Sequence, residues 1–166
     1  MKKSYSVVFA MAVSLFIYVF YRSDKTVVNA LVIFLLSLET YTALKSSVVN
    51  TIPLNDLVIF SLPGGLWVFC ATTLSGGFYL SRKHFKIQVA FIPLAFAVGL
   101  EFCQLIHITN GRFDVLDIAA YLFFWSLAYY LIEPGETPQK VLSPFTLPGF
   151  ICLACILSVY LAHVNQ

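Results

Sequence analysis

Residues 94–130 decide the fold of this chain, and they read LAFAVGLEFCQLIHITNGRFDVLDIAAYLFFWSLAYY. Two apolar runs in this stretch are joined by a short polar segment that contains Asn110 and Gly111. Both of these residue types accept a positive φ, so the pair predicts a tight turn. The stretch therefore predicts two antiparallel helices that meet at a polar turn.

The composition of the whole chain indicates where such helices lie. Of its 166 residues, 60% are hydrophobic and 11% are charged, and the mean hydropathy is +0.87. A soluble domain of this size does not have enough interior to shield so many apolar side chains. We therefore expect lipid to be the solvent and the chain to be an integral membrane protein.

Several windows of the sequence are long enough to cross a bilayer. A hydrocarbon core about 30 Å thick requires roughly 20 residues of helix, at a rise of about 1.5 Å per residue. Up to six windows approach that length: 4–21, 27–44, 57–80, 87–108, 114–132 and 148–164. They are continuous and lack the alternation of a membrane barrel, so strands are not expected. The predicted fold class is all-α, a polytopic transmembrane helical bundle of five to six membrane segments that forms a single domain, residues 1–166.

Two of these windows carry further signals. Window 4–21 follows the basic pair Lys2 and Lys3 but lacks a small-residue cleavage site, so we interpret it as a retained anchor rather than a signal peptide. Window 57–80 contains small residues at spacings that let a neighbouring helix approach closely: Ala71, Thr72, Ser75, Gly76 and Gly77.

The basic residues favour two different orientations. If all six windows cross and the N-terminus is inside, most Lys and Arg residues lie outside, which inverts the usual cytoplasmic excess. Inverting the bundle, or making window 27–44 re-entrant, places the basic loop 82–86 in the cytoplasm and Arg112 on the outer side. We expect Arg112 to face outward.

Polar side chains around the predicted turn form the candidate ligand site: Glu101, Gln104, Arg112, Asp114, Asp117 and Tyr121. Glu101 and Gln104 are three residues apart and His107 adds another step of three, so the trio forms a polar stripe on a helix. Glu101 lies roughly 12 Å below the turn at 1.5 Å per residue, inside the apolar layer. A carboxyl group there is costly unless it is protonated or has a partner. We expect Gln104 to donate to it and Arg112 to reach it, with Asp114 or Asp117 balancing the remaining charge.

Two interpretations of this cluster remain open. In the first, it is a polar pocket at one membrane face, in which Arg112 holds an anionic group such as a lipid phosphate or a carboxylate. In the second, Arg112 reaches the headgroups, Asp114 caps the next helix, and Glu101 with Gln104 only joins two helices. Because Glu101, Gln104 and Asp117 lie on converging faces, we favour the pocket.

The pattern Glu101-x-x-Gln104, followed by Gly111-Arg112-x-Asp114-x-x-Asp117 and an apolar helix, resembles the signature of the VanZ-like family of small bacterial membrane proteins. The resemblance covers residues 94–130, in a family-like core of residues 57–133. It implies a multi-pass protein of the bacterial cytoplasmic (inner) membrane with a role in the cell envelope, such as antibiotic resistance of the teicoplanin type. It implies no reaction. The chain departs from the family in one stretch, where relatives tend to carry an Asn and paired glycines and this chain has Ala119, Ala120, Tyr121 and Ser126. We therefore expect helix packing and the ligand to differ from those of the family.

Other types of site have little support in the sequence. The three histidines lack a metal-binding spacing, and Cys152-x-x-Cys155 has no second pair, so we interpret the cysteines as apolar filler. We expect no metal, no cofactor and no nucleic-acid partner. Three functions remain: binding of a membrane lipid or other amphiphilic ligand, docking of the small-residue face to a larger membrane-protein partner, or lipid modification with Glu101 and Asp117 as acid and base. The sequence shows no nucleophile beside a base, so an enzyme is less favoured than a binding protein.

Overall fold

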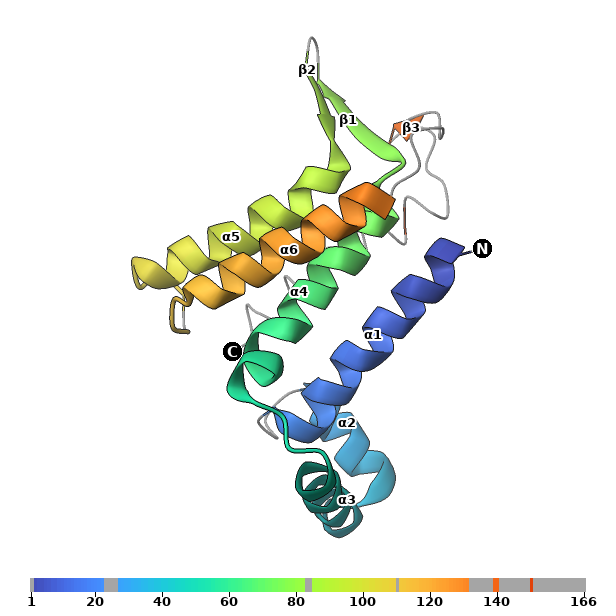
Figure 1. Ribbon diagram of the computed structural model, residues 1–166, viewed down its shortest axis with the longest axis vertical. Helices are drawn as coiled ribbons and strands as arrows, with labels where there is room; N and C mark the ends of the chain where they lie inside the picture. The colour runs from blue at the N-terminus through green and yellow to red at the C-terminus, as the bar shows by residue number, and fades with distance from the viewer. Residues whose placement is uncertain are drawn as a thin grey trace.

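Figure 1 shows the computed structural model of the chain, which describes residues 2–22, 27–82, 85–109, 111–131, 139–140 and 150. The described part is mostly helical, as predicted. Its elements in chain order are α1 (Lys2–Tyr21), α2 (Val27–Leu36), α3 (Leu38–Thr51), α4 (Asp56–Ser75), β1 (Phe78–Arg82), β2 (Phe85–Gln88), the 3-10 helix η1 (Val89–Phe91), α5 (Ile92–Leu105), α6 (Val115–Leu131) and β3 (Gln139–Lys140).

Helix α4 is the centre of the fold, and both α1 and α6 pack against it (Figure 1). Half of the α4 span is buried inside the protein, whereas only 17% of the α1 span is buried, so most of α1 faces outward. A small hydrophobic cluster joins the three helices: Ala10, Phe69, Cys70 and Ala128. Small residues in this cluster allow the helix backbones to approach one another.

Two glycines set the distance between α4 and α6. A Cβ atom at Gly64 would lie 2.8 Å from Cε1 of Tyr121, and one at Gly65 would lie 2.4 Å from Cδ2 of Phe124. Both separations are too short for real carbon contacts, so the two aromatic rings rest on bare glycine backbone. This packing fixes the depth at which Tyr121 enters the helix layer.

The segment after α4 corrects the predicted helix 57–80. Helix α4 ends at Ser75, with Gly76 as its C-cap, and the chain then forms an antiparallel hairpin of β1 and β2 with Arg82 opposite Phe85. Strand β3 pairs in parallel with β1 on its other edge. The paired glycines end the helix because glycine lowers helix propensity. The expectation that strands are absent was wrong for residues 78–82 and 85–88.

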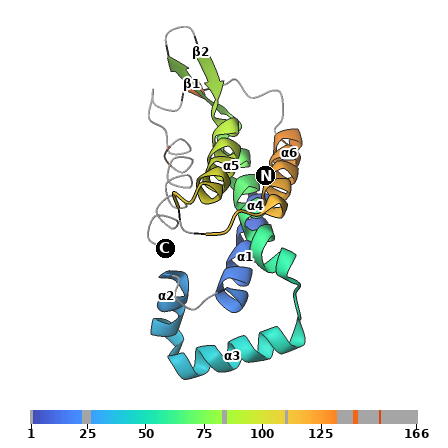
Figure 2. The same ribbon diagram turned by 90° about the vertical axis from the view of Figure 1, so that its left-hand side faces the viewer.

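The second window is also interrupted. Helices α2 and α3 meet at Ser37, which has a φ of 73°, and the axes on either side of it are bent by 116°. The side chain of Ser37 accepts a hydrogen bond from the backbone N–H of Thr40 at 3.4 Å, so it caps the new helix. Figure 2 shows α3 lying across the end of α1 rather than beside it. Residues 27–44 do not form one straight crossing.

Within the described residues, two helices are long and apolar enough to cross a membrane: Ser4–Tyr21 and Asp56–Ser75. The bent α2–α3 pair would be a third if it counted as one span, and Val89–Leu105 and Val115–Leu131 are shorter apolar helices. Helix length and composition therefore support a membrane protein. The predicted window 148–164 lies outside the described residues except for Phe150.

Candidate functional site

The candidate site lies where α5 ends and α6 begins. The two helices lie side by side and run in opposite directions, as the Asn110-Gly111 pair predicted (Figures 1 and 2). Pro93 is in the first turn of α5, where its missing N–H leaves no hydrogen bond unmade. Both helices are shorter than their predicted windows, so the connecting segment is longer than a two-residue turn.

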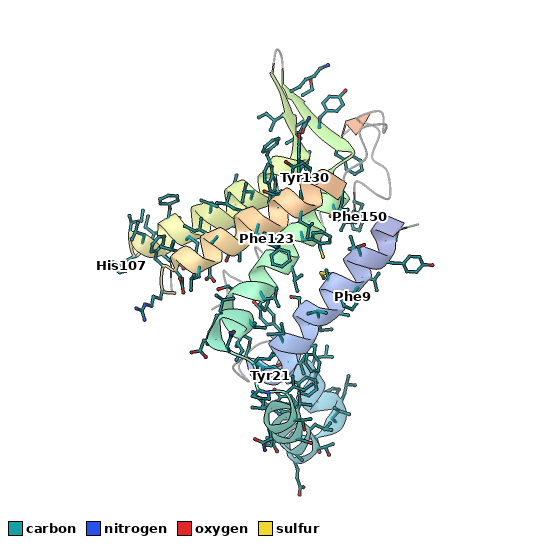
Figure 3. All side chains as sticks on the ribbon, viewed as in Figure 1. Phe9, Tyr21, His107, Phe123, Tyr130 and Phe150 are labelled. Atoms are coloured by element: carbon teal, nitrogen blue, oxygen red, sulfur yellow. The ribbon has the colours of Figure 1, made fainter. Side chains whose placement is uncertain are left out.

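Helix α5 ends in a Schellman motif. The N–H of Ile108 donates to the carbonyl of Cys103 at 2.8 Å, and the N–H of His107 donates to the carbonyl of Gln104 at 3.0 Å. His107 has a φ of 58°, a left-handed conformation that is more usual for glycine at this position. The predicted polar stripe of Glu101, Gln104 and His107 therefore includes only the first two residues, because the helix ends before His107. Figure 3 shows His107 at the tip of the α5–α6 pair, with Tyr130 at the opposite end.

Glu101 is the buried centre of the site, with only 3% of its surface exposed. Its Oε2 accepts a hydrogen bond from the backbone N–H of Asp114 at 3.2 Å, and its Oε1 accepts one from the Tyr121 hydroxyl at 3.4 Å. These two donors come from the segment before α6 and from α6 itself. The carboxyl group of Glu101 thus joins the end of α5 to the beginning of α6.

Asp114 begins α6 as its capping residue. Its Oδ1 accepts a hydrogen bond from the backbone N–H of Leu116 at 2.8 Å, which satisfies one of the free donors at the helix start. The side chains of Glu101 and Asp114 therefore both accept backbone donors near one helix N-terminus, where the helix dipole favours negative charge. The capping role proposed in the second interpretation of the sequence fits this geometry.

Gln104 is half-buried and packs against Gly111. Gly111 has a φ of 130°, and a Cβ atom there would lie 2.7 Å from Nε2 of Gln104. Glycine is therefore required at position 111 for both its conformation and its size. In the part of the chain that the structure describes, the Gln104 amide does not donate to Glu101, so that expectation was wrong.

Arg112 does not reach Glu101. Its side chain is exposed, and the structure shows no ion pair between Arg112 and any described carboxylate. The donors that Arg112 was expected to supply come instead from the Asp114 backbone and from Tyr121. Arg112 is left free to contact groups outside the protein.

Asp117 is the member of the cluster that lacks a full set of partners. It is half-buried and lies close enough to Glu101 and Tyr121 to interact with both electrostatically. Its Oδ1 is buried and has no hydrogen-bond partner among the described residues, and the same holds for Oγ1 of Thr109. A buried acceptor without a donor is costly, so Asp117 is the place in the cluster where an external donor would be most favourable.

An apolar groove begins one helical turn further along α6 than the polar cluster. Its volume is about 360 Å³, and its walls come from α1, α4 and α6: Ser6, Phe9, Ala10, Val13, Leu62, Leu66, Phe69, Phe124, Leu127 and Leu131. Phe124 of this groove is one helical turn from Tyr121 of the polar cluster, and the two rings rest on adjacent glycines of α4. Polar and apolar surfaces therefore meet along one side of α6.

The structure adds contributors that the sequence analysis missed. The backbone N–H of Asp114 and the two glycines Gly64 and Gly65 position Glu101 and Tyr121, although none of them is a polar side chain. The Pro63-Gly64-Gly65 segment was a usable signal for close helix packing. Cys70 is buried, with its Sγ 3.6 Å from the carbonyl oxygen of Val7, and Cys103 is half-buried, whereas Cys152 and Cys155 lie outside the described residues.

No protein-family model, curated protein or solved structure matches this chain.

Proposed function

We propose that this chain is a VanZ-like membrane protein that binds an amphiphile or envelope lipid at the cluster of Glu101, Asp117 and Arg112. In this proposal it lies in the bacterial cytoplasmic membrane, crosses it several times, and affects the cell envelope or resistance to an amphiphilic antibiotic. The sequence pattern supports the family, and the helix lengths support the membrane. The geometry of the buried carboxyl groups supports the binding site.

The observation that carries the proposal is the difference between the two acids. Both acceptor oxygens of Glu101 have donors from the protein, whereas Oδ1 of Asp117 is buried without one. A carboxyl group that only joins two helices needs donors from the protein alone, as Glu101 has. Oδ1 of Asp117, in contrast, is an acceptor that a hydroxyl or ammonium group of a ligand would satisfy.

The surroundings of Asp117 match the parts of an amphiphile. Arg112 is exposed at the same turn and presents a guanidinium group that suits a phosphate or carboxylate. The groove beside Phe124 is apolar and suits a hydrocarbon chain. A molecule with a hydrogen-bond donor, an anionic group and a tail would use all three features.

In the proposed arrangement, one orientation also accounts for the distribution of the basic residues. Helices α1 and α4 are antiparallel, and α3 does not return the chain to the other side, so the N-terminus and the β-hairpin lie at the same end (Figure 1). If α5, α6 and window 148–164 also cross, the chain has five crossings. Six of the ten basic residues then lie with the N-terminus, which satisfies the cytoplasmic excess: Lys2, Lys3, Arg82, Lys83, Lys86 and Lys140. Arg112 faces outward in this arrangement.

An accessory subunit remains a second candidate, but its proposed docking face is already occupied. Ala71, Thr72 and Ser75 are each buried within this chain, with at most 1% of their surface exposed. A partner protein would have to use a different surface. A lipid-modifying enzyme would need Glu101 as an acid or base, although both oxygens of this residue are already engaged.

Mass spectrometry of the lipids retained on the purified protein tests the proposal. We expect Asp117→Asn and Glu101→Gln to lose a lipid that the parent protein retains, and we expect the matched variant Glu39→Gln, at an exposed acid of α3, to keep it. Thermal unfolding of each variant in the same detergent separates lost binding from lost folding. Equal lipid retention in folded Asp117→Asn and in the parent protein would reject the site.

A further inference from the structure

Helix α3 has no role in the proposed site, yet it is held firmly at one end of the protein. We propose that α3 lies flat in the headgroup layer of the bilayer, at the side where α1 ends, and contacts lipid along both of its flanks. This inference is independent of the ligand site. Its partner is the membrane itself.

The direction of α3 is the first argument. Helix α1 is one of the two helices long enough to cross the membrane, and α3 lies across its end (Figure 2). The bend of 116° at Ser37 separates α3 from the direction of α2. A helix of 14 residues that crosses the end of a span cannot run parallel to it, so it lies close to the membrane plane.

The attachment of α3 to α1 is the second argument. The hydroxyl of Tyr41 donates to the carbonyl of Val19 at 2.8 Å, and Nζ of Lys45 donates to the carbonyl of Arg22 at 2.9 Å. These carbonyls belong to the C-terminal end of α1, where the helix itself supplies no donors. Tyr41 is 1% exposed, so this contact is a fixed part of the fold.

A further hydrogen bond holds the other end of α3. The hydroxyl of Tyr21, at the end of α1, donates to the carbonyl of Ile52, the C-cap residue of α3 (Tyr21 is labelled in Figure 3). The helix is thus attached through its middle and its C-terminus. Its orientation relative to α1 does not depend on the membrane.

The distribution of side chains around α3 is the third argument. At about 100° per residue, the apolar residues Leu38, Tyr41, Leu44, Val48 and Val49 share one side of the helix. The opposite side carries small polar residues and one acid: Glu39, Thr40, Thr42, Ser46, Ser47 and Asn50. A helix with one apolar and one polar side suits the boundary between hydrocarbon and water.

The apolar side is only partly used by the protein. Tyr41 fills the middle of that side, but Leu38 is 60% exposed on one flank and Leu44 is 44% exposed on the other. These two narrow apolar strips lie on either side of the contact with α1. Acyl chains that surround α1 would cover both strips, whereas water would leave this apolar surface exposed, which is unfavourable.

The residues near the C-terminal end of α1, beside α3, are those expected at a membrane interface. The Arg22 guanidinium lies 5.1 Å from the ring centre of Tyr18 and 5.5 Å from that of Phe60, which belongs to α4. A guanidinium group has five N–H donors, so contact with two rings still leaves donors for an acceptor. Lipid phosphates supply such acceptors in the layer where tyrosines also concentrate.

Thiol labelling in vesicles tests this placement. Leu44→Cys and Ser47→Cys place a cysteine at exposed positions on the apolar flank and on the polar side, so neither change disturbs the core. The protein is reconstituted into vesicles of phosphatidylcholine and phosphatidylglycerol, which are made permeable by freezing and thawing, and is exposed to a water-soluble maleimide. The unsubstituted protein gives the background from the native cysteines.

We expect Ser47→Cys to react at least about tenfold faster than Leu44→Cys in vesicles, and the two to react equally after unfolding in dodecyl sulfate. Protein contacts cannot produce this difference, because Leu44 is 44% exposed in the protein alone. Equal fast labelling in vesicles would show that α3 stands in water. Slow labelling at both positions would show that a partner protein covers the helix or that α3 crosses the bilayer, and either result overturns the proposal.

Discussion

Tyr121 of α6 donates its hydroxyl hydrogen to Glu101 of α5, across 3.4 Å, while its ring rests on Gly64 of α4. One side chain therefore links three helices. The hydroxyl satisfies a buried acceptor, and the ring fills the space that a glycine leaves open. These two contributions can be separated by experiment.

Replacing Tyr121 with Phe removes only the hydroxyl. We expect this variant to lose about 1–3 kcal/mol of unfolding free energy, because Oε1 of the buried Glu101 is left without a donor. Tyr121→Ala also removes the ring from Gly64, so we expect a larger loss of about 3–5 kcal/mol. Denaturant unfolding of the detergent-solubilised protein, followed by circular dichroism, measures both. If Phe and Ala are equally damaging, the ring packing does not stabilise the fold.

The two glycines of α4 give a second prediction. Gly65→Ala brings a methyl group to 2.4 Å from Phe124, and Gly64→Ala brings one to 2.8 Å from Tyr121. We expect each to lower the unfolding free energy by about 1–3 kcal/mol, because α4 and α6 must move apart. Gly99→Ala in α5 is the matched control, since a Cβ there would meet nothing within 4 Å. We expect Gly99→Ala to be neutral or stabilising by up to about 1 kcal/mol, and a loss as large as that of Gly65→Ala would contradict this account.

Several features of the fold and the site followed from the sequence. The two apolar runs on either side of Asn110-Gly111 predicted the α5–α6 hairpin. The polar residues between the runs would be costly in lipid, so they were expected at a helix end or in the protein interior. The burial of Glu101 followed from the same argument, since a carboxyl group one third of the way down an apolar helix must turn inward.

Other features could not be read from residue types. The break at Ser37 lies in an apolar run without Gly or Pro, and a single serine is a weak signal for a helix start. The donor to Glu101 from Asp114 is a backbone N–H, which every residue but proline carries, so the sequence pointed to Arg112 instead. The strand Phe78–Arg82 begins with apolar residues that extend the preceding helical window, and only the paired glycines before it mark the change.

The end of α5 gives a third prediction, which concerns a stabilising change. His107 occupies the left-handed position of the Schellman motif with a φ of 58°, and its side chain is exposed. Glycine adopts this conformation without the penalty of roughly 1–2 kcal/mol that other residues carry. We expect His107→Gly to raise the melting temperature. His107→Ala keeps a Cβ and serves as the control, and if it stabilises the protein as much as glycine does, relief of backbone strain is not the cause.

At Gly111, in contrast to His107, we expect a substitution to destabilise the protein. Its φ of 130° and the contact of its missing Cβ with Gln104 both exclude a side chain. We expect Gly111→Ala to lower the unfolding free energy by about 1–3 kcal/mol through backbone strain, with a further loss from the clash. Adding Gln104→Ala to that variant removes the clash but not the strain, so only part of the stability should return. Full recovery in the double variant would show that the backbone tolerates alanine at this φ.

The sidedness of the protein gives a fifth prediction. In Figure 1, α1 and α4 are antiparallel, so strand β1, which contains Ser81, lies at the same end as the N-terminus. The proposed orientation assigns that end to the cytoplasm because of its positive charges. In intact cells we expect a membrane-impermeant maleimide to label Arg112→Cys, and to label Ser81→Cys only after the membrane is permeabilised. Both positions are exposed, so access depends on the membrane rather than on packing. Labelling of Ser81→Cys in intact cells, with Arg112→Cys protected, would invert the proposed orientation. Labelling of both would mean that α5 and α6 enter and leave on one side and that the loop between them does not reach the other side.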